Sequence, residues 1–168
     1  MKKRVFLAAG VAVLSAAVLA ACSSGNGNKE ATKPVTYAYV FSSDPATLDY
    51  TVSGQKSIKQ ITGNVIDGLL ENDQYGNLVP SVAEDWTVSK DGLTYTYKIR
   101  KGIKWYTNEG EEYGEVKAQD FVTGLKHAAD KKSEGLYLVQ DSIKGLNDYI
   151  NGKTTDFSTV GVKATDDY

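Results

Sequence analysis

Hydrophobic and polar residues alternate in some parts of the chain and recur with a longer period in others. Residues 35–41 alternate, which predicts a strand. From 57 to 69 the apolar residues fall three and four positions apart, which predicts an amphipathic helix with Ser53 or Ser57 as its N-cap. The apolar stripe of that helix consists of Ile58, Ile61, Val65 and Leu69.

A hairpin is predicted around Asp91-Gly92, between strands at 87–89 and 93–100. One face of the second strand is apolar and expected to pack, while the other face is polar and expected to meet solvent. The apolar face consists of Leu93, Tyr95, Tyr97 and Ile99. Residues 80–86 are expected to form a short helical turn before the hairpin, and 103–106 a further strand, followed by an acidic loop at 108–115.

The last third of the chain returns to the helical period. Residues 118–129 predict one helix, with Phe121 and Leu125 on its apolar stripe. Residues 135–150 predict a second helix, and 160–165 open another strand. The stripe of the second helix consists of Leu136, Val139, Ile143, Leu146 and Ile150.

The first 22 residues have the order of a secretory signal peptide, because three basic residues at 2–4 precede an apolar run. The alternative is a transmembrane anchor, which needs about 20 strongly apolar residues, whereas this run is short and rich in Ala. Its end, Leu-Ala-Ala-Cys at 19–22, resembles the lipobox of bacterial lipoproteins, whose Cys thiol receives a diacylglycerol. The resemblance implies lipidation at Cys22, which would hold the protein on the cell membrane, facing the extracellular or periplasmic side.

Residues 23–34, SSGNGNKEATKP, contain no large apolar side chain and have the composition of a flexible tether. We therefore expect three parts: signal peptide and lipobox at 1–22, tether at 23–34 and folded domain at 35–168. Removal of the three basic residues with the signal peptide takes the formal net charge from −2 to −5. A mildly acidic chain without a basic patch does not have the character of a nucleic-acid-binding protein.

Three motifs that could indicate an active or metal site have simpler interpretations. Gly152-Lys153-Thr154 resembles the end of a phosphate-binding loop, but Asn147 stands where that loop needs Gly. His127 is the only His, has no Cys neighbours and is expected on a solvated helix face. The Glu residues of 108–115 lack the alternating Asp and Asn of a calcium loop. With no second His for a catalytic triad, we expect no enzyme, cofactor or metal site.

A series of short motifs is similar, in order, to the amino-terminal segment of a known receptor family. The motifs are DPATLD at 44–49, IDGLL at 66–70, SVAEDW at 81–86, SKDGLTYTY at 89–97 and IRKGIKW at 99–105. They resemble the extracellular solute-binding proteins of family 5, the oligopeptide- and dipeptide-binding receptors of ABC importers. The resemblance covers 36–168. It departs from the family at Lys117, where a Thr or Asn cap is common, and in the longer loop 107–115.

The resemblance implies a mixed α/β fold of the two-lobed periplasmic-binding-protein type II kind, which closes on its ligand about a hinge. Members are several hundred residues long, so this chain is expected to hold only part of the first lobe. By position, Ser42, Ser43 and Asp44 are expected at the ligand cleft, with capping of the following turn as the alternative role of Asp44. Trp105 and Tyr106 belong to a group of aromatic residues near strand ends, some of which are expected to line the cleft.

The function implied is capture of extracellular oligopeptides and their delivery to a membrane permease driven by separate ATPase subunits. Main-chain hydrogen bonds would supply affinity independently of peptide sequence. Dipeptides, nickel and haem remain alternative ligands within the family. A peptide-sensing or adhesive surface lipoprotein on the same fold, or a truncated receptor without function, remain alternative identities.

Overall fold

The computed structural model describes residues 36, 38, 40 and 43–168. The predicted signal peptide and tether, and most of the predicted strand at 35–41, lie outside these residues. The chain divides into two units, Met1–Val40 and Phe41–Tyr168, and the second contains all the helices and strands described below. No described helix has the length and apolar character needed to cross a bilayer.

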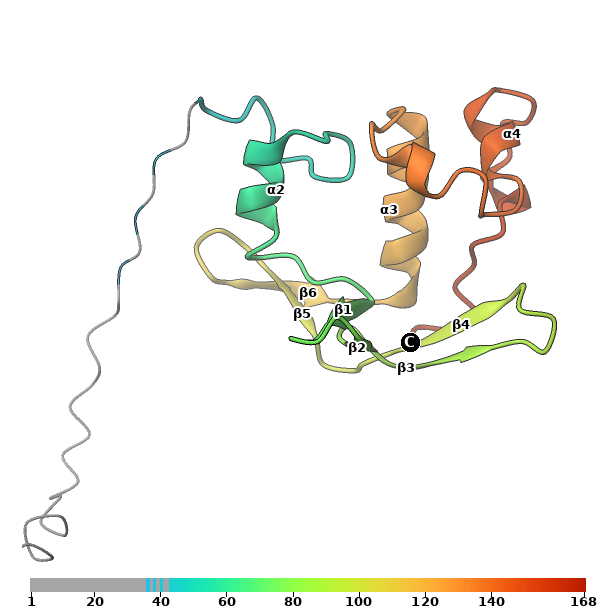
Figure 1. Ribbon diagram of the computed structural model, residues 1–168, viewed down its shortest axis with the longest axis horizontal. Coiled ribbons are helices and arrows are strands. Elements are labelled where there is room, and N and C mark those ends of the chain that lie inside the picture. The colour runs from blue at the N-terminus through green and yellow to red at the C-terminus, as the bar shows by residue number, and fades with distance from the viewer. Residues whose placement is uncertain (1–35, 37, 39, 41–42) are drawn as a thin grey trace, which may run out of the picture. The chain divides into compact units, whose positions relative to one another are not determined.

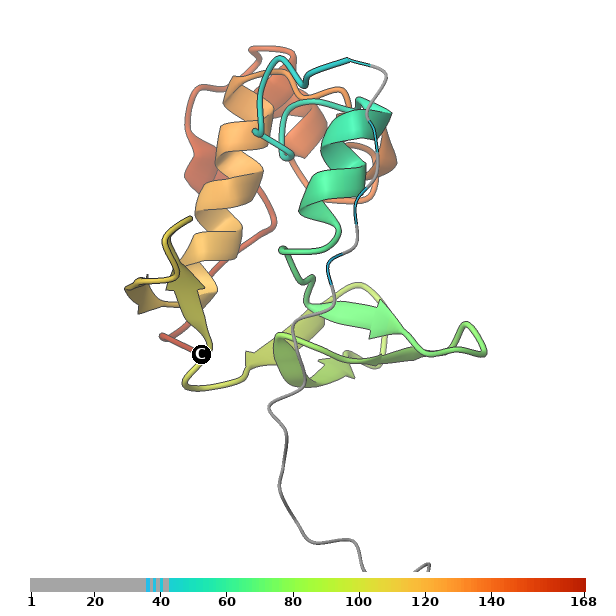
Figure 2. The ribbon, with the colours of Figure 1, turned by 90° about the vertical axis from the view of Figure 1, so that its left-hand side faces the viewer.

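The second unit consists of three antiparallel β-ribbons with helices standing on one side of them (Figures 1 and 2). The ribbons pair β1 (Leu70–Asn72) with β2 (Leu78–Pro80), β3 (Ala83–Val88) with β4 (Tyr95–Ile99), and β5 (Lys104–Tyr106) with β6 (Glu112–Glu115). The α-helices are α2 (Lys56–Thr62), α3 (Ala118–Asp130) and α4 (Leu146–Ile150). Two short 3₁₀ helices, η1 (Leu136–Leu138) and η2 (Phe157–Thr159), flank α4 in sequence.

The β3–β4 hairpin confirms the turn predicted at Asp91-Gly92. Gly92 has φ +73°, which a residue without a Cβ adopts at little cost. The Ser89 hydroxyl donates a 2.5 Å hydrogen bond to Asp91 Oδ1 and accepts one from the Thr94 N–H. The helical turn expected at 80–86 is wrong, because β3 begins at Ala83 and its backbone groups are satisfied by pairing with β4.

The apolar face of the same hairpin is only partly packed, contrary to the sequence expectation. Ile99 is buried, but Leu93 is 82% exposed and Tyr95 is 57% exposed. Their strand register places Tyr95 opposite Val88, which is also exposed. The described part of the chain therefore leaves the outer half of this face uncovered.

Helix α3 confirms the helix predicted at 118–129 and contributes to two separate hydrophobic clusters. Its first turns pack Phe121 against a cluster of buried residues from the ribbons: Val82, Ile99 and Val116. Its last turns place Leu125 and Ala129 in a second cluster around the fully buried Leu146 and Val160. The amphipathic period thus identified both the helix and its buried face.

The single helix expected at 135–150 is wrong. Gly145 has φ +75°, a left-handed conformation that interrupts the helical path, so only η1 and the short α4 form. The predicted apolar stripe nevertheless packs, because Val139, Ile143 and Ile150 all contact the second cluster.

Two further expectations need correction. The strand predicted at 160–165 is not formed; the segment is irregular and Val160 is instead buried in the second cluster. Helix α2 begins after Gln55, without a side-chain cap, and ends at Thr62, so Val65 lies outside it and is exposed. The Gly63 N–H donates a 3.0 Å hydrogen bond to the Lys59 carbonyl and closes the helix, whose last residue, Thr62, lies seven residues before the predicted end at Leu69.

Candidate functional site

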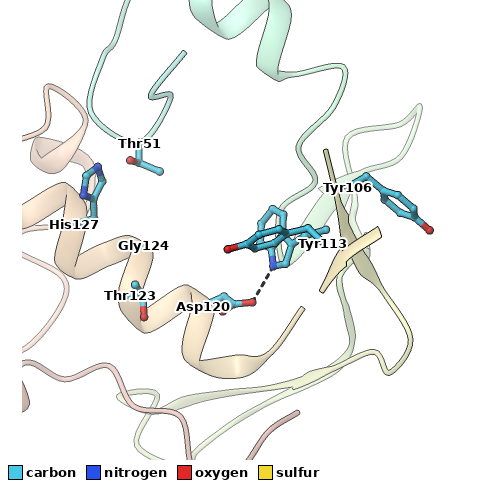
Figure 3. Close-up of a pocket in the computed structure, with 8 residues that line it drawn as sticks. Thr51, Tyr106, Tyr113, Asp120, Thr123, Gly124 and His127 are labelled. Carbon is cyan, nitrogen blue, oxygen red and sulfur yellow. Dashed lines mark hydrogen bonds between the residues drawn. The ribbon is translucent and has the colours of Figure 1, made fainter. Parts of the chain in front are cut away.

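A pocket of about 490 Å³ opens between one face of α3, the β5–β6 ribbon and the loop before α2 (Figure 3). It is lined by Thr51, Trp105, Tyr106, Tyr113, Asp120, Thr123, Gly124 and His127. The volume falls within the range of pockets that hold small ligands, about 300 to 1,000 Å³.

Helix α3 supplies one side of the pocket through its spacing. Asp120, Gly124 and His127 lie four and three positions apart, so they share one helix face. Phe121 and Leu125 belong to the adjoining face, which packs against the clusters. The same amphipathic helix therefore presents apolar residues to the core and polar residues to the pocket.

The Asp120 carboxylate joins the helix start to the β5–β6 ribbon. Its Oδ2 accepts a 2.9 Å hydrogen bond from the Trp105 indole N–H and a 3.0 Å bond from the Lys117 backbone N–H. The second bond is the contribution that an acidic residue at the third helical position makes to a capping box, and it satisfies an otherwise free backbone donor at the helix start. Two donors from different elements thus hold this carboxylate in place beside the aromatic ring.

The opposite end of the pocket holds a histidine–carboxylate pair that the sequence did not reveal. His127 Nε2 lies 2.7 Å from Asp49 Oδ2, and the Thr51 hydroxyl donates a 2.6 Å hydrogen bond to Asp49 Oδ1. The pKa of Asp49 lies below its usual value, mainly because of the hydrogen bond to His127 and secondly because of the one from Thr51. His127 is therefore engaged by a carboxylate 78 residues away in sequence, rather than lying on a merely solvated face.

A network of charges lies beside the pocket, at the junction of β6 and α3. Glu115 accepts a 2.8 Å hydrogen bond from the Gly102 N–H, and Lys117 Nζ lies 3.2 Å from the same carboxylate. Lys117 also donates to the Tyr168 hydroxyl. The Gly102 N–H, with help from Tyr168 and Lys117, lowers the pKa of Glu115 to about 2. These contacts keep the lysine occupied with partners outside the pocket.

The structure places the predicted site residues in three different situations. Trp105 and Tyr106 both line the pocket, although Tyr106 points away from Asp120 (Figure 3), as expected for consecutive residues of a strand. Ser43 and Asp44 are exposed and do not line it. Ser42 and Cys22 lie outside the described residues. The ligand-binding role of all five cleft residues and the lipidation of Cys22 remain predictions.

Sequence reasoning missed most of the polar side of this pocket. Asp120, Gly124 and His127 recur at helical spacing beside the apolar stripe of α3, and that pattern was a usable signal. The pairing of Asp49 with His127 carried no such signal, since only the tertiary fold brings the two together. Among the residues that the structure describes, no three His, Cys, Asp or Glu side chains form a group suited to a metal ion.

The fold is mixed α/β and matches part of several solved peptide receptors. It is similar to Listeria monocytogenes OppA bound to peptide, with a TM-score of 0.62 and 29% identity over 72% of this chain and 23% of that one. It is equally similar to the Escherichia coli murein tripeptide binding protein MppA, with a TM-score of 0.62 and 28% identity over 74% of this chain and 24% of that one. The expected fold class is thereby confirmed.

Curated relatives are similar over nearly the whole chain. The oligopeptide-binding protein AmiA of Streptococcus pneumoniae serotype 4 (strain ATCC BAA-334 / TIGR4) is 64% identical over 99% of this chain and 25% of its own length. The oligopeptide-binding protein SarA of Streptococcus gordonii (strain Challis) is 62% identical over 100% of this chain and 26% of its own length. A dipeptide-binding protein of Lactococcus lactis subsp. cremoris (strain MG1363) is 35% identical over 94% of this chain and 27% of its own length. The chain therefore spans about a quarter of the length of these relatives.

The family assignment rests on a match that covers more than half of the chain. Residues 77–168 match the family described as bacterial extracellular solute-binding proteins, family 5 Middle. The family is one of solute receptors rather than enzymes, as the absence of a catalytic motif in the sequence had led us to expect. The chain belongs to the bacterial extracellular solute-binding proteins of family 5.

Proposed function

We propose that the chain is the amino-terminal part of a receptor that captures extracellular oligopeptides for an ABC importer. The observation that carries this proposal is the 64% identity, over 99% of the chain, to a protein named as oligopeptide-binding. The identity to a dipeptide-binding relative is only 35%, which favours longer peptides as ligands. In this proposal the chain contributes part of one lobe of a two-lobed receptor, and the remaining wall of the ligand cleft comes from sequence beyond residue 168.

The receptor is held at the cell membrane by lipid on Cys22, with residues 23–34 as the tether between the lipid and the folded domain. The signal-peptide pattern before Cys22 and the polar composition after it support this arrangement. The receptor delivers the peptide to a membrane permease, which separate ATPase subunits drive. Replacement of Cys22 by Ser should release the protein into the medium, whereas retention on the membrane would contradict the lipid anchor.

Peptide binding is tested on the full-length native protein, extracted from the producing cells with detergent. Calorimetric titration with a hexapeptide library should show saturable binding, while dipeptides, Ni²⁺ and haem bind more weakly or not at all. Stronger binding of a dipeptide, Ni²⁺ or haem than of any hexapeptide would replace oligopeptides as the ligand class. Absence of binding to all of these would refute the receptor function.

Import is a separate step from capture, and uptake measurements distinguish a transport receptor from a sensor. Cells that lack the protein should take up labelled oligopeptides more slowly than cells that produce it. Unchanged uptake together with retained peptide binding would refute the transport role and favour the alternative of a peptide-sensing lipoprotein.

A further inference from the structure

The pocket beside α3 contains a carboxylate without a cationic partner. Asp120 Oδ2 receives its two hydrogen bonds from neutral donors, the Trp105 indole and the Lys117 backbone N–H. Within the part of the chain that the structure describes, no Lys, Arg or His nitrogen lies within 4.0 Å of the Asp120 carboxylate. Its negative charge is therefore left for a partner from outside the described residues.

The lysines that precede Trp105 and the start of α3, Lys104 and Lys117, are already paired elsewhere. Lys104 Nζ lies 2.8 Å from Glu112, and Lys117 Nζ lies 3.2 Å from Glu115 and 3.6 Å from Asp167. His127 lies against Asp49 at the far end of the pocket. With His127 paired to Asp49, the Asp120 carboxylate has no cationic partner among the pocket-lining residues, so the pocket favours a positive charge.

Aromatic rings stand beside the free carboxylate and suit the same kind of ligand. Trp105 is 36% exposed, and its hydrogen bond to Asp120 fixes the ring while leaving part of its surface open to the pocket. Tyr113, from the same ribbon, is 80% exposed and also lines the pocket. Aromatic faces attract Lys and Arg side chains, and Trp does so most strongly.

The floor of the pocket is kept open by a glycine in the middle of α3. Gly124 lines the pocket, and a Cβ built at this position would meet no atom within 4 Å. The pocket therefore has open space on the α3 side, about one turn after Asp120, and a larger side chain at 124 would enter it.

We propose that this pocket binds a cationic side chain, Lys or Arg, of the captured peptide, with Asp120 as the counter-ion and Trp105 as the aromatic wall. The proposal rests on the oligopeptide-binding function inferred above and specifies its preference. A charged group paired with a carboxylate and held against an aromatic face gains affinity that an uncharged side chain of equal length does not.

The test is a lysine scan on the full-length native protein. Lys is placed in turn at each position of a hexa-alanine peptide, and norleucine at the same positions supplies peptides of similar length without the charge. At one or more positions the Lys peptide should bind about threefold to thirtyfold more tightly than its norleucine counterpart, and high salt should reduce the difference.

Three variants connect this preference to the pocket. Asp120→Asn removes the charge, and Gly124→Leu fills the space without removing any proposed binding group, so both should abolish the preference for Lys. Glu111→Gln removes a charge from the exposed turn of the same ribbon, away from the pocket lining, and should leave the preference unchanged. Thermal melts of each variant establish that it is folded before binding is measured.

The outcomes separate this inference from the receptor function. Equal affinities for every Lys and norleucine pair, or a preference that survives both Asp120→Asn and Gly124→Leu, would overturn the cationic pocket while peptide binding itself stands. Failure of every peptide to bind the unaltered protein would overturn the receptor function and this inference with it.

Discussion

Replacement of Gly145 by Ala tests the contact that anchors the last segment of the chain to the start of α4. Gly145 has φ +75°, and a Cβ at this position would lie 2.8 Å from the Thr159 carbonyl oxygen. Next to it, the Gly161 N–H donates a 2.7 Å hydrogen bond to the Lys144 carbonyl. The two backbones therefore approach closely, and the added methyl group would push them apart.

The expected loss of stability has two parts. A left-handed conformation costs an Ala residue roughly 1 to 2 kcal/mol relative to Gly. Displacement of the Thr159 carbonyl weakens the neighbouring Gly161 to Lys144 hydrogen bond, for about 0.5 to 1.5 kcal/mol more. Gly145→Ala should therefore lower the free energy of unfolding by about 1.5 to 3.5 kcal/mol.

Gly152→Ala is the matched control, because Gly152 has φ +72° but no atom within 4 Å of a built Cβ. It should show only the conformational part, about 1 to 2 kcal/mol. Both variants are measured by urea denaturation of the native protein, with the midpoint and slope fitted for each. Equal losses for the two variants would refute the close backbone contact at Thr159.

Three further predictions concern other parts of the fold. Because the folded-state pKa of Glu115 is lowered from 4.5 to about 2, its contribution to stability is complete above pH 4.5 and is lost as pH falls towards 2. Glu115→Gln should therefore flatten the fall in the free energy of unfolding between pH 4.5 and 2. An unchanged slope over this pH range would contradict the role of Glu115. Gly124→Ala should raise the free energy of unfolding by about 0.5 to 1 kcal/mol, measured as an increase of about 3 °C in Tm, because alanine favours the helix and the added Cβ meets no atom. A decrease in Tm would show that no open space lies beside this residue. Leu146→Ala should lower the free energy of unfolding by about 2 to 5 kcal/mol because Leu146 is fully buried. Its control is Leu138→Ala, which should change that free energy by less than about 0.5 kcal/mol because Leu138 is 65% exposed. Similar losses for both variants would contradict the packing of Leu146 in the second cluster.

The sequence predicted those elements whose signal is local. The period of α3 and the Asp91-Gly92 turn were both recognised correctly, since a helix face and a tight turn are encoded by nearby residues. The helix expected at 135–150 failed at Gly145, because an apolar stripe at helical spacing does not reveal a left-handed residue within it. The first part of strand β3, before the strand predicted at 87–89, was missed because its conformation depends on pairing with β4, which the pattern of 80–86 does not contain.

The candidate site was predictable to a similar extent. Trp105 and Tyr106 were identified from their place at a strand end, and both line the pocket. The pairing of Asp49 with His127 was not predictable, because 78 residues separate them and each alone has an ordinary role on a protein surface. Long-range pairs of this kind require the fold, whereas the helical spacing of Asp120 and Gly124 was visible in the sequence.

The first cluster has a consequence for the order in which the chain can fold. Tyr168 packs against this cluster, and the Asp167 carbonyl accepts a 2.9 Å hydrogen bond from the Ala118 N–H at the start of α3. Contacts between residues so far apart in sequence form late, because a long loop must close first. During synthesis and export the ribbons are made early, yet their cluster stays incomplete until residues 167 and 168 arrive. Throughout that interval the apolar side chains of this cluster are incompletely covered and open to other chains, and proteins that bind the emerging chain and prevent its aggregation would act at this stage.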